Sequence, residues 1–117
     1  MTYSLESCTP AHYAELLAAA LNTDDSRNWE PSPSVIGDVA MTERRTIGDT
    51  IASQTVTLYP AELVNGLAKG SVSSTITYVC AESKVHTDTR TAWFNFALDS
   101  DVVALRLVIA DSFQTLN

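Results

Sequence analysis

The side chains best suited to acid–base, nucleophilic or metal chemistry are few and widely separated. The chain contains two histidines, His12 and His86, and two cysteines, Cys8 and Cys80. None of them falls in a metal-ligand spacing, and no Cys-x-x-Cys, glycine-rich phosphate loop or nucleophile elbow is present. We therefore predict a protein that is not an enzyme and that holds no metal and no small-molecule cofactor. A site assembled from distant residues stays open.

The local setting of each of these residues favours a structural interpretation. His12 falls in the first turn of a predicted helix, and His86 lies beside Asp88 in a predicted hairpin, so both are expected at the surface. Cys80 alternates onto an apolar strand face, which is typical of a packed thiol. No secretory signal precedes Cys8, and both cysteines are expected to be reduced.

Length and charge restrict the class of protein. The 117 residues, 45% of them hydrophobic and 18% charged, suffice for one domain with one core. The net charge of −7 argues against broad, nonspecific nucleic-acid binding. Residues 1–31 carry five acids and a single base, Arg27, whereas the other bases lie from Arg44 onward, so a local basic face in the second half remains open. The longest apolar run is interrupted by Arg106 and is too short for a membrane span.

Two helices are predicted, one near each end of the sequence. Thr9-Pro10 is a typical helix start, and apolar residues at helical spacing follow as far as Leu21. Residues 1–33 therefore form a helical arm with a polar connector over 23–33. Asp99-Ser100-Asp101 is expected to cap a helix over residues 102–116, within a C-terminal segment 100–117.

Residues 34–99 show the period-two pattern of an antiparallel sheet. The predicted strands cover residues 35–41, with an extension toward Ile47, and then 53–59, 71–81 and 90–98. We expect a turn at Gly48-Asp49, a strand end at Pro60, a short helix or loop over 62–67 closed by Lys69-Gly70, and a hairpin connection over 82–89.

The last three strands sort their side chains onto two different faces. One side carries Gln54, Val56, Leu58, Val72, Ile76, Tyr78, Cys80, Ala92, Phe94, Phe96 and Leu98. The other side carries Ser53, Thr55, Thr57, Tyr59, Ser73, Thr75, Thr77, Thr91, Trp93 and Asn95. The second set is uncharged and rich in hydroxyl groups. It is either an ordinary solvent-exposed strand face, because threonine suits strands, or a surface that binds a partner through hydrogen bonds and ring stacking.

The C-terminal helix is apolar around most of its circumference, which is typical of a helix buried on more than one side. A chain of this size has little protein with which to bury it, so we predict self-association, with a dimer as the commonest case. The candidate dimer-interface residues are Val102, Leu105, Ile109, Phe113 and Leu116. The predicted fold is α+β: an antiparallel meander sheet with an N-terminal and a C-terminal helix packed on one face, completed by dimerisation.

This pattern resembles the coat proteins of single-stranded RNA bacteriophages (levivirus-like). The likeness is carried by residues 71–81, 91–98 and the run Asp99-Ser100-Asp101-Val102-Val103-Ala104-Leu105, about a third of the chain. The resemblance implies a homodimer that builds a shell, with RNA against the inner sheet face. By that resemblance, the candidate RNA-binding residues are Arg44, Arg45, Thr55, Thr57, Tyr59, Thr75, Thr77, Trp93 and Asn95.

We therefore predict a structural, self-assembling protein, a viral coat subunit located in the virion and assembled in the host cytoplasm. Homo-oligomer and RNA are its expected partners, without a membrane. Two alternatives are a small ligand-binding module of cystatin-like or cone-like shape, which would be cytoplasmic, and a phage tail or connector component that assembles without nucleic acid.

Overall fold

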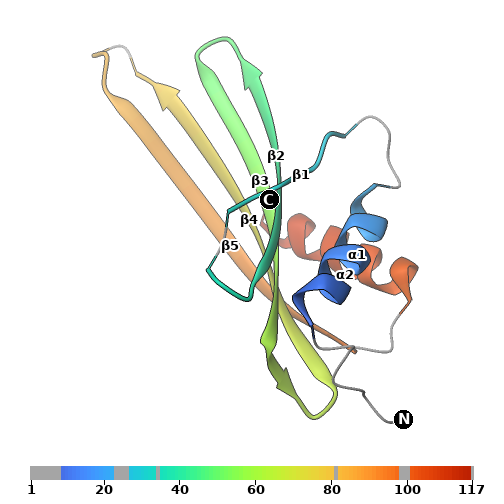
Figure 1. The fold of residues 1–117 in the computed structure, drawn as a ribbon. Helices are drawn as coiled ribbons and strands as arrows, with labels where there is room; N and C mark the ends of the chain where they lie inside the picture. The colour runs from blue at the N-terminus through green and yellow to red at the C-terminus, as the bar shows by residue number, and fades with distance from the viewer. Residues whose placement is uncertain (1–8, 23–26, 34, 81, 98–100, 117) are drawn as a thin grey trace.

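The computed structural model describes residues 9–22, 27–33, 35–80, 82–97 and 101–116. Along the chain it contains α1 (Pro10–Leu21), β1 (Glu30–Pro31), β2 (Val39–Ile47), β3 (Thr50–Val64), β4 (Leu67–Val79), β5 (Val85–Ala97) and α2 (Val102–Thr115). Both helices lie on the same side of one sheet (Figure 1). The predicted α+β fold, a meander sheet with two helices on one face, is confirmed.

The sheet is an antiparallel meander in the order β1-β2-β3-β4-β5. The four longer strands form hairpins whose tips extend past the helical layer in both directions along the strands (Figure 1). The molecule is correspondingly elongated, with principal extents of 57 × 27 × 24 Å. The helices therefore cover only the middle of one sheet face.

Both helices begin where side-chain caps predict. The Thr9 hydroxyl oxygen accepts a hydrogen bond from the His12 amide at 3.2 Å, and Pro10 occupies the first turn. A carboxylate oxygen of Asp101 accepts one from the Ala104 amide at 2.7 Å. These bonds satisfy N–H groups that have no partner within the helix. The predicted helix over residues 10–21 is confirmed, and α2 ends at Thr115, one residue before the predicted end; Asp99 and Ser100 lie outside the described residues.

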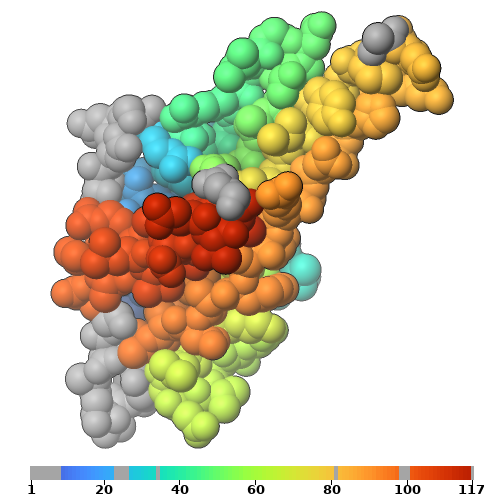
Figure 2. Space-filling view, turned by 180° about the vertical axis from the view of Figure 1, so that it is seen from behind, coloured from blue at the N-terminus to red at the C-terminus, as the bar shows by residue number. Residues whose placement is uncertain are grey.

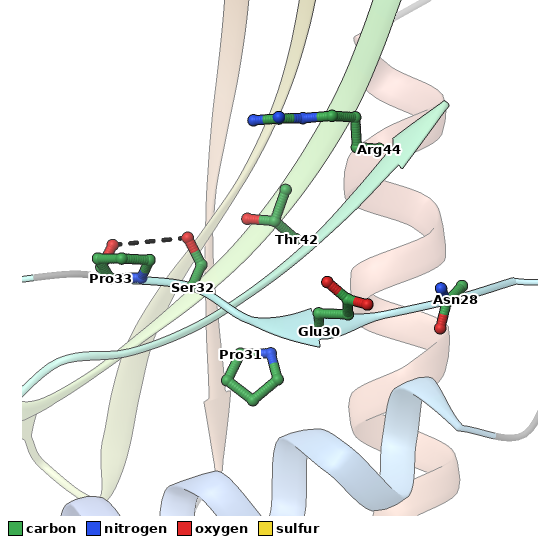
Figure 3. A pocket seen from close by; sticks show the side chains of 7 residues that line it. All are labelled: Asn28, Glu30, Pro31, Ser32, Pro33, Thr42 and Arg44. Carbon is green, nitrogen blue, oxygen red and sulfur yellow. Dashed lines mark hydrogen bonds between the residues drawn. The ribbon is translucent and has the colours of Figure 1, made fainter. Parts of the chain in front are cut away.

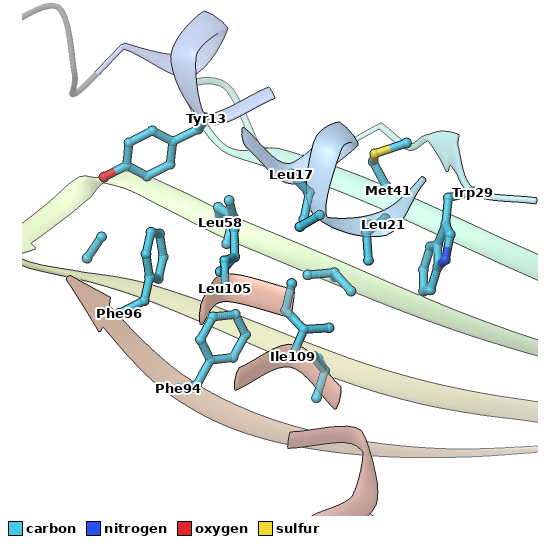
Figure 4. Close-up of a cluster of buried hydrophobic side chains, with 14 residues drawn as sticks. Tyr13, Leu17, Leu21, Trp29, Met41, Leu58, Phe94, Phe96, Leu105 and Ile109 are labelled. Atoms are coloured by element: carbon cyan, nitrogen blue, oxygen red, sulfur yellow. The ribbon is translucent and has the colours of Figure 1, made fainter. Parts of the chain in front are cut away.

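The core lies between the two helices and the middle of the sheet (Figure 4). Its fully buried members come from α1, β3, β4 and α2 and are Tyr13, Leu17, Val56, Leu58, Ala68, Val72 and Leu105. Phe94 and Phe96 of β5 complete the core next to the β5 edge of the sheet. This face of the sheet is the apolar one that the alternation predicts.

The candidate dimer-interface residues of α2 pack against their own chain. Leu105 and Ile109 are buried in the core of their own chain, and Val102, Phe113 and Leu116 are half-buried against it. Because α1 packs directly against α2, a single chain buries the stripe that we assigned to a partner. The large apolar side chains that α2 leaves exposed are Val103 and Leu107, at 48% and 62%.

The connection between β3 and β4 also differs from the prediction. Pro60 does not end the strand: β3 continues to Val64, with a shift of register between Tyr59 and Leu63. Asn65 and Gly66, both with positive φ (54° and 78°), make a two-residue hairpin turn, so residues 62–67 are neither a helix nor a loop. Positive φ at both turn positions matches the twist of paired strands and favours Asn-Gly. Lys69 and Gly70 consequently lie inside β4.

Other strand boundaries also move. β3 begins at Thr50 instead of Ser53, and β4 ends at Val79. β2 begins at Val39, because residues 35–37 form a turn in which Gly37 has φ of 94°. β5 begins at Val85 instead of Arg90, so the predicted hairpin connection is shorter than expected. The predicted turn at residues 48–49 is confirmed. Within the connector, Glu30 and Pro31 pair with β2 as a short edge strand.

An ion-pair cluster fastens the connector to the helix-covered side of the sheet. The Glu43 side chain is only 6% exposed, and its carboxylate accepts hydrogen bonds from Arg27 Nη2 at 2.7 Å and from the Asn28 amide at 3.1 Å. Arg45 Nε lies 3.3 Å from the same carboxylate. The Arg27 guanidinium also donates a hydrogen bond to the Gln54 side chain, and it lies 4.7 Å from the centre of the Trp29 ring. The hydrogen bond from Arg27 is the main reason that the pKa of Glu43 lies below its ordinary value of 4.5, against the opposing effect of burial.

Glu43→Gln is expected to lower the free energy of unfolding at neutral pH by about 1–3 kcal/mol, because Arg27 loses its buried counter-ion. A carboxyl with a lowered folded-state pKa stabilises the fold above its unfolded pKa, and this stability is lost as the pH falls through the folded value. The wild type should therefore lose stability below about pH 4.5 more steeply than the variant, as measured by urea unfolding at several pH values. Glu15→Gln, on the exposed side of α1, is the control and should keep the wild-type profile.

A glycine and an aromatic ring are paired across the centre of the sheet. Gly70 of β4 lies directly opposite Phe94 of β5. A Cβ atom at position 70 would stand 2.3 Å from Cζ of the Phe94 ring, so the ring lies against the bare backbone. The absence of a side chain at this position therefore permits Phe94 to reach the core.

Gly70→Ala is expected to lower the free energy of unfolding by about 1–3 kcal/mol, because the ring must leave its place in the core. Urea unfolding measures this loss. In a Phe94→Leu background the added methyl group meets no ring, so the same substitution should cost markedly less. Equal costs in the two backgrounds would contradict the assigned contact.

Candidate nucleic-acid interface

The sheet face that points away from the helices is here named the open face. It is formed by paired strand residues, most of them polar, namely Thr42, Arg44, Thr46, Ile51, Ser53, Thr55, Thr57, Tyr59, Lys69, Ser71, Ser73, Thr75, Thr77, Thr87, Thr89, Thr91, Trp93 and Asn95. The apolar Ala40, Val64, Leu67, Val79, Val85 and Ala97 lie on the same face, mostly toward the ends of the strands. Its position follows from the alternation of side chains, because the helices cover the residues between these.

Hydroxyl groups on neighbouring strands bond each other across the open face. The side-chain oxygens of Thr42 and Thr55 lie 2.9 Å apart, and those of Thr75 and Thr89 lie 3.0 Å apart. A hydroxyl has one donor and two acceptor sites, so each pair retains hydrogen-bonding capacity toward a ligand. The face thus offers rows of fixed, uncharged hydrogen-bonding groups.

An aromatic platform stands near the β3–β4 end of the open face. The ring centres of Tyr59 and Trp93 are 5.6 Å apart with a 32° tilt, and the Tyr59 hydroxyl lies 2.9 Å from the Ser71 hydroxyl. Lys69 Nζ stands 4.3 Å from the Trp93 ring centre and 3.2 Å from a carboxylate oxygen of Glu62. Trp93 is still 58% exposed, which leaves ring surface free for stacking.

Arg44 marks the other side of the open face. Together with Thr42 it lines a shallow polar hollow that the connector completes, with Asn28, Glu30, Pro31, Ser32 and Pro33 as the remaining lining residues (Figure 3). The exposed guanidinium is suited to a phosphate, which it can bind through two parallel hydrogen bonds.

The charge on the open face differs from that of the whole chain. The chain carries a net charge of −7, yet the paired open-face positions of β2 to β5 contain Arg44 and Lys69 and no carboxylate. Glu30 of β1 pairs with Thr42 and shares its face at the β1 edge, and Glu62 contacts Lys69 near the β3–β4 turn. Glu43 and Asp88 project from the helix-covered side. The carboxylates near the open face are thus confined to its rim.

The structure brings eight of the nine candidate RNA-binding residues onto the open face. These are Arg44, Thr55, Thr57, Tyr59, Thr75, Thr77, Trp93 and Asn95. Arg45, the ninth candidate, lies apart from them, because it pairs with Ala52 on the helix-covered side and contacts Glu43. The alternation along β2 puts adjacent arginines on opposite faces.

Several open-face residues were missed from the sequence, among them Lys69, Thr87 and Thr89. Lys69 was placed in a loop, and Thr87 and Thr89 were placed in a hairpin connection. The Asn65-Gly66 turn signal would have extended β4 back to Lys69. The alternation of threonines at 87, 89 and 91 would have extended β5.

The sequence matches no protein-family model, no curated protein and no solved structure. Across the described ranges, no three His, Cys, Asp or Glu side chains gather closely enough to bind a metal ion, and no helix is long and apolar enough to cross a membrane. His12 lies edge-on to Tyr13 on α1, and His86 stacks on Tyr78 at 5.2 Å on the β4–β5 hairpin. Cys80 is a half-buried free thiol at the same hairpin, and Cys8 lies outside the described residues.

Proposed function

We propose that this protein is a viral coat subunit that forms dimers, and that the dimers build an RNA-containing shell with the open face turned inward toward the RNA. The proposal places the protein in the virion, assembled in the host cytoplasm. The observation that carries it is the open face itself, a broad hydroxyl-rich surface on which the paired positions of β2 to β5 carry no carboxylate, in a strongly acidic chain.

The groups on the open face suit single-stranded RNA. Arg44 can neutralise a phosphate, the threonine rows can bond 2′-hydroxyl groups and base edges, and Trp93 can stack a base. Asn95, exposed two residues after Trp93 on the same face, adds an amide that can donate and accept hydrogen bonds beside a stacked ring. With few cations, such a face binds through many weak contacts.

The helical layer suits the outside of a shell. Glu15 on α1 and Asp111 on α2 are exposed there, on the side of the sheet away from the hydroxyl rows. Negative charge on that layer is separated from RNA by the thickness of the sheet and helices, so it opposes RNA binding less than charge on the open face would.

The decisive measurement is the mass and nucleic-acid content of the full chain produced in bacteria. Size-exclusion chromatography with light scattering should give particles of megadalton mass whose absorbance at 260 nm shows RNA. A clean dimer without nucleic acid would contradict the coat proposal and favour a binding module. Rings or tubes without RNA would contradict it in favour of a tail or connector component.

Adjacent arginines provide a matched test of which face meets RNA. Arg44→Gln should reduce the slope of log affinity against log salt for a single-stranded 20-nucleotide RNA by about 0.7, the value for one lost phosphate contact. Arg45→Gln makes the same charge change on the opposite face and should leave that slope unchanged. Trp93→Leu should weaken binding by about 1–3 kcal/mol through lost stacking. Filter binding at several salt concentrations measures all three, and equal effects of the two arginine variants would refute the face assignment.

A further inference from the structure

A single base interrupts the apolar surface of α2. Every residue from Val102 to Ala110 except Arg106 is apolar. The Arg106 side chain is half-buried, and within the described part of the chain it forms no hydrogen bond and no ion pair. A guanidinium that is partly withdrawn from water binds an anion more strongly than one in open solvent, because the dielectric around it is lower. Arg106 is therefore placed to bind an anion from outside.

A cavity of about 210 Å³ lies beside Arg106, where the end of α1, the connector and α2 meet. Its walls are mostly apolar, and they include Leu21 of α1, Trp29 of the connector, and Ile109, Ala110 and Phe113 of α2. Figure 4 shows Leu21 and Trp29 next to each other at one end of the core. Ala110 is exposed, and Figure 2 shows α2, drawn in red, at the surface of the molecule, so a ligand can enter the cavity from solvent.

The cavity has one positive charge available to a ligand. Arg27 also lines it, but the Arg27 guanidinium already binds the Glu43 carboxylate at 2.7 Å. Asp111 lines a neighbouring hollow that shares Ala110 with the cavity, and it does not line the cavity itself. Arg106 therefore remains as the charged group that can pair with a ligand inside an apolar setting.

The size and shape of the cavity restrict the apolar part of such a ligand. The volume is below the roughly 300 Å³ at which pockets for drug-sized molecules begin. The rings of Trp29 and Phe113 contact each other directly, with centres 6.3 Å apart and a tilt of 35°, so no flat slot for an aromatic ring lies between them. A narrow, flexible hydrocarbon chain fits these walls better than a rigid ring system does. Its anionic end is best a carboxylate, which a guanidinium binds through two parallel hydrogen bonds.

We propose that this cavity binds a medium-chain fatty acid, with the acyl chain against Leu21, Trp29 and Phe113 and the carboxylate on Arg106. The site lies on the helix-covered side of the sheet and shares no residue with the open face. The inference therefore goes beyond the proposed function and depends neither on RNA nor on self-assembly.

Tryptophan fluorescence can report on the cavity directly. The chain has two tryptophans, and Trp93→Phe on the open face leaves Trp29, in the wall of the cavity, as the sole reporter. Titration of this variant with decanoate, below its micelle concentration and at neutral pH, should change the Trp29 emission and saturate at one ligand per chain. Octanoate should bind about tenfold more weakly, because two fewer methylene groups are buried.

Two unpaired arginines provide a matched test of the carboxylate contact. In the same background, Arg106→Gln should raise the dissociation constant of decanoate about ten- to a hundredfold, because the charged hydrogen bonds are lost. Decanol carries no charge and should bind equally well with and without this substitution. Arg44→Gln makes the same charge change on the open face and should leave decanoate binding unchanged. Ala110→Leu, at the mouth of the cavity, should weaken decanoate and decanol alike.

The outcomes separate this site from the coat proposal. No saturable change of Trp29 emission with decanoate overturns the inference, even if RNA-filled particles form. Equal effects of the two arginine variants show general charge attraction and overturn the role of Arg106, and unchanged binding in Ala110→Leu overturns the location. The expected pattern in a chain that takes up no RNA would support the site and overturn the coat proposal. Circular dichroism checks the fold of each variant, and the comparison of decanoate, octanoate and decanol tests the inference without any change at the site.

Discussion

The packing of two helices against one face of the sheet is the contact on which the rest of the molecule depends. Tyr13 and Leu17 from α1 and Leu105 from α2 meet the middle of β3 and β4, and this contact supplies the fully buried side chains. Both helices lie on one face of the sheet, so their apolar side chains cover that face only. The other face must consist of residues that tolerate water or a partner, and its hydroxyl groups meet that requirement.

The position of the connector depends on a second, electrostatic contact. Arg27 and Glu43 hold it against β2, and Trp29 then reaches the core, where its ring lies 6.3 Å from that of Phe113 on α2. Arg27, the one base of the acidic N-terminal region, is therefore occupied by an ion pair within its own chain. It also brings β1 alongside β2 and completes the polar hollow beside Arg44.

The parts of the structure that the sequence predicted are those that short-range rules govern. Thr9 and Asp101 set the helix starts through their own side chains, and alternation sorted the residues of β3 to β5 onto the correct faces. The errors arose where a distant contact decides. The face occupied by Arg45 depends on the register of β2 with β3, and the burial of Leu105 depends on α1, more than 80 residues earlier. Pro60 lies where the register shifts, which lets a strand continue through a residue that usually ends one.

The short strand β1 has a consequence for how far a sheet of this protein can grow. A chain of sheets lengthens without limit only if every added copy brings a fresh edge, as in a fibril. At the β1 edge, Pro31 has no N–H to offer to a further strand, and β1 covers Met41 and Thr42 of β2. Growth by strand pairing at that edge is therefore restricted to residues 43–47 of β2, and the apolar side chains exposed at the hairpin ends, such as Ile47 and Val64, offer contacts of another kind.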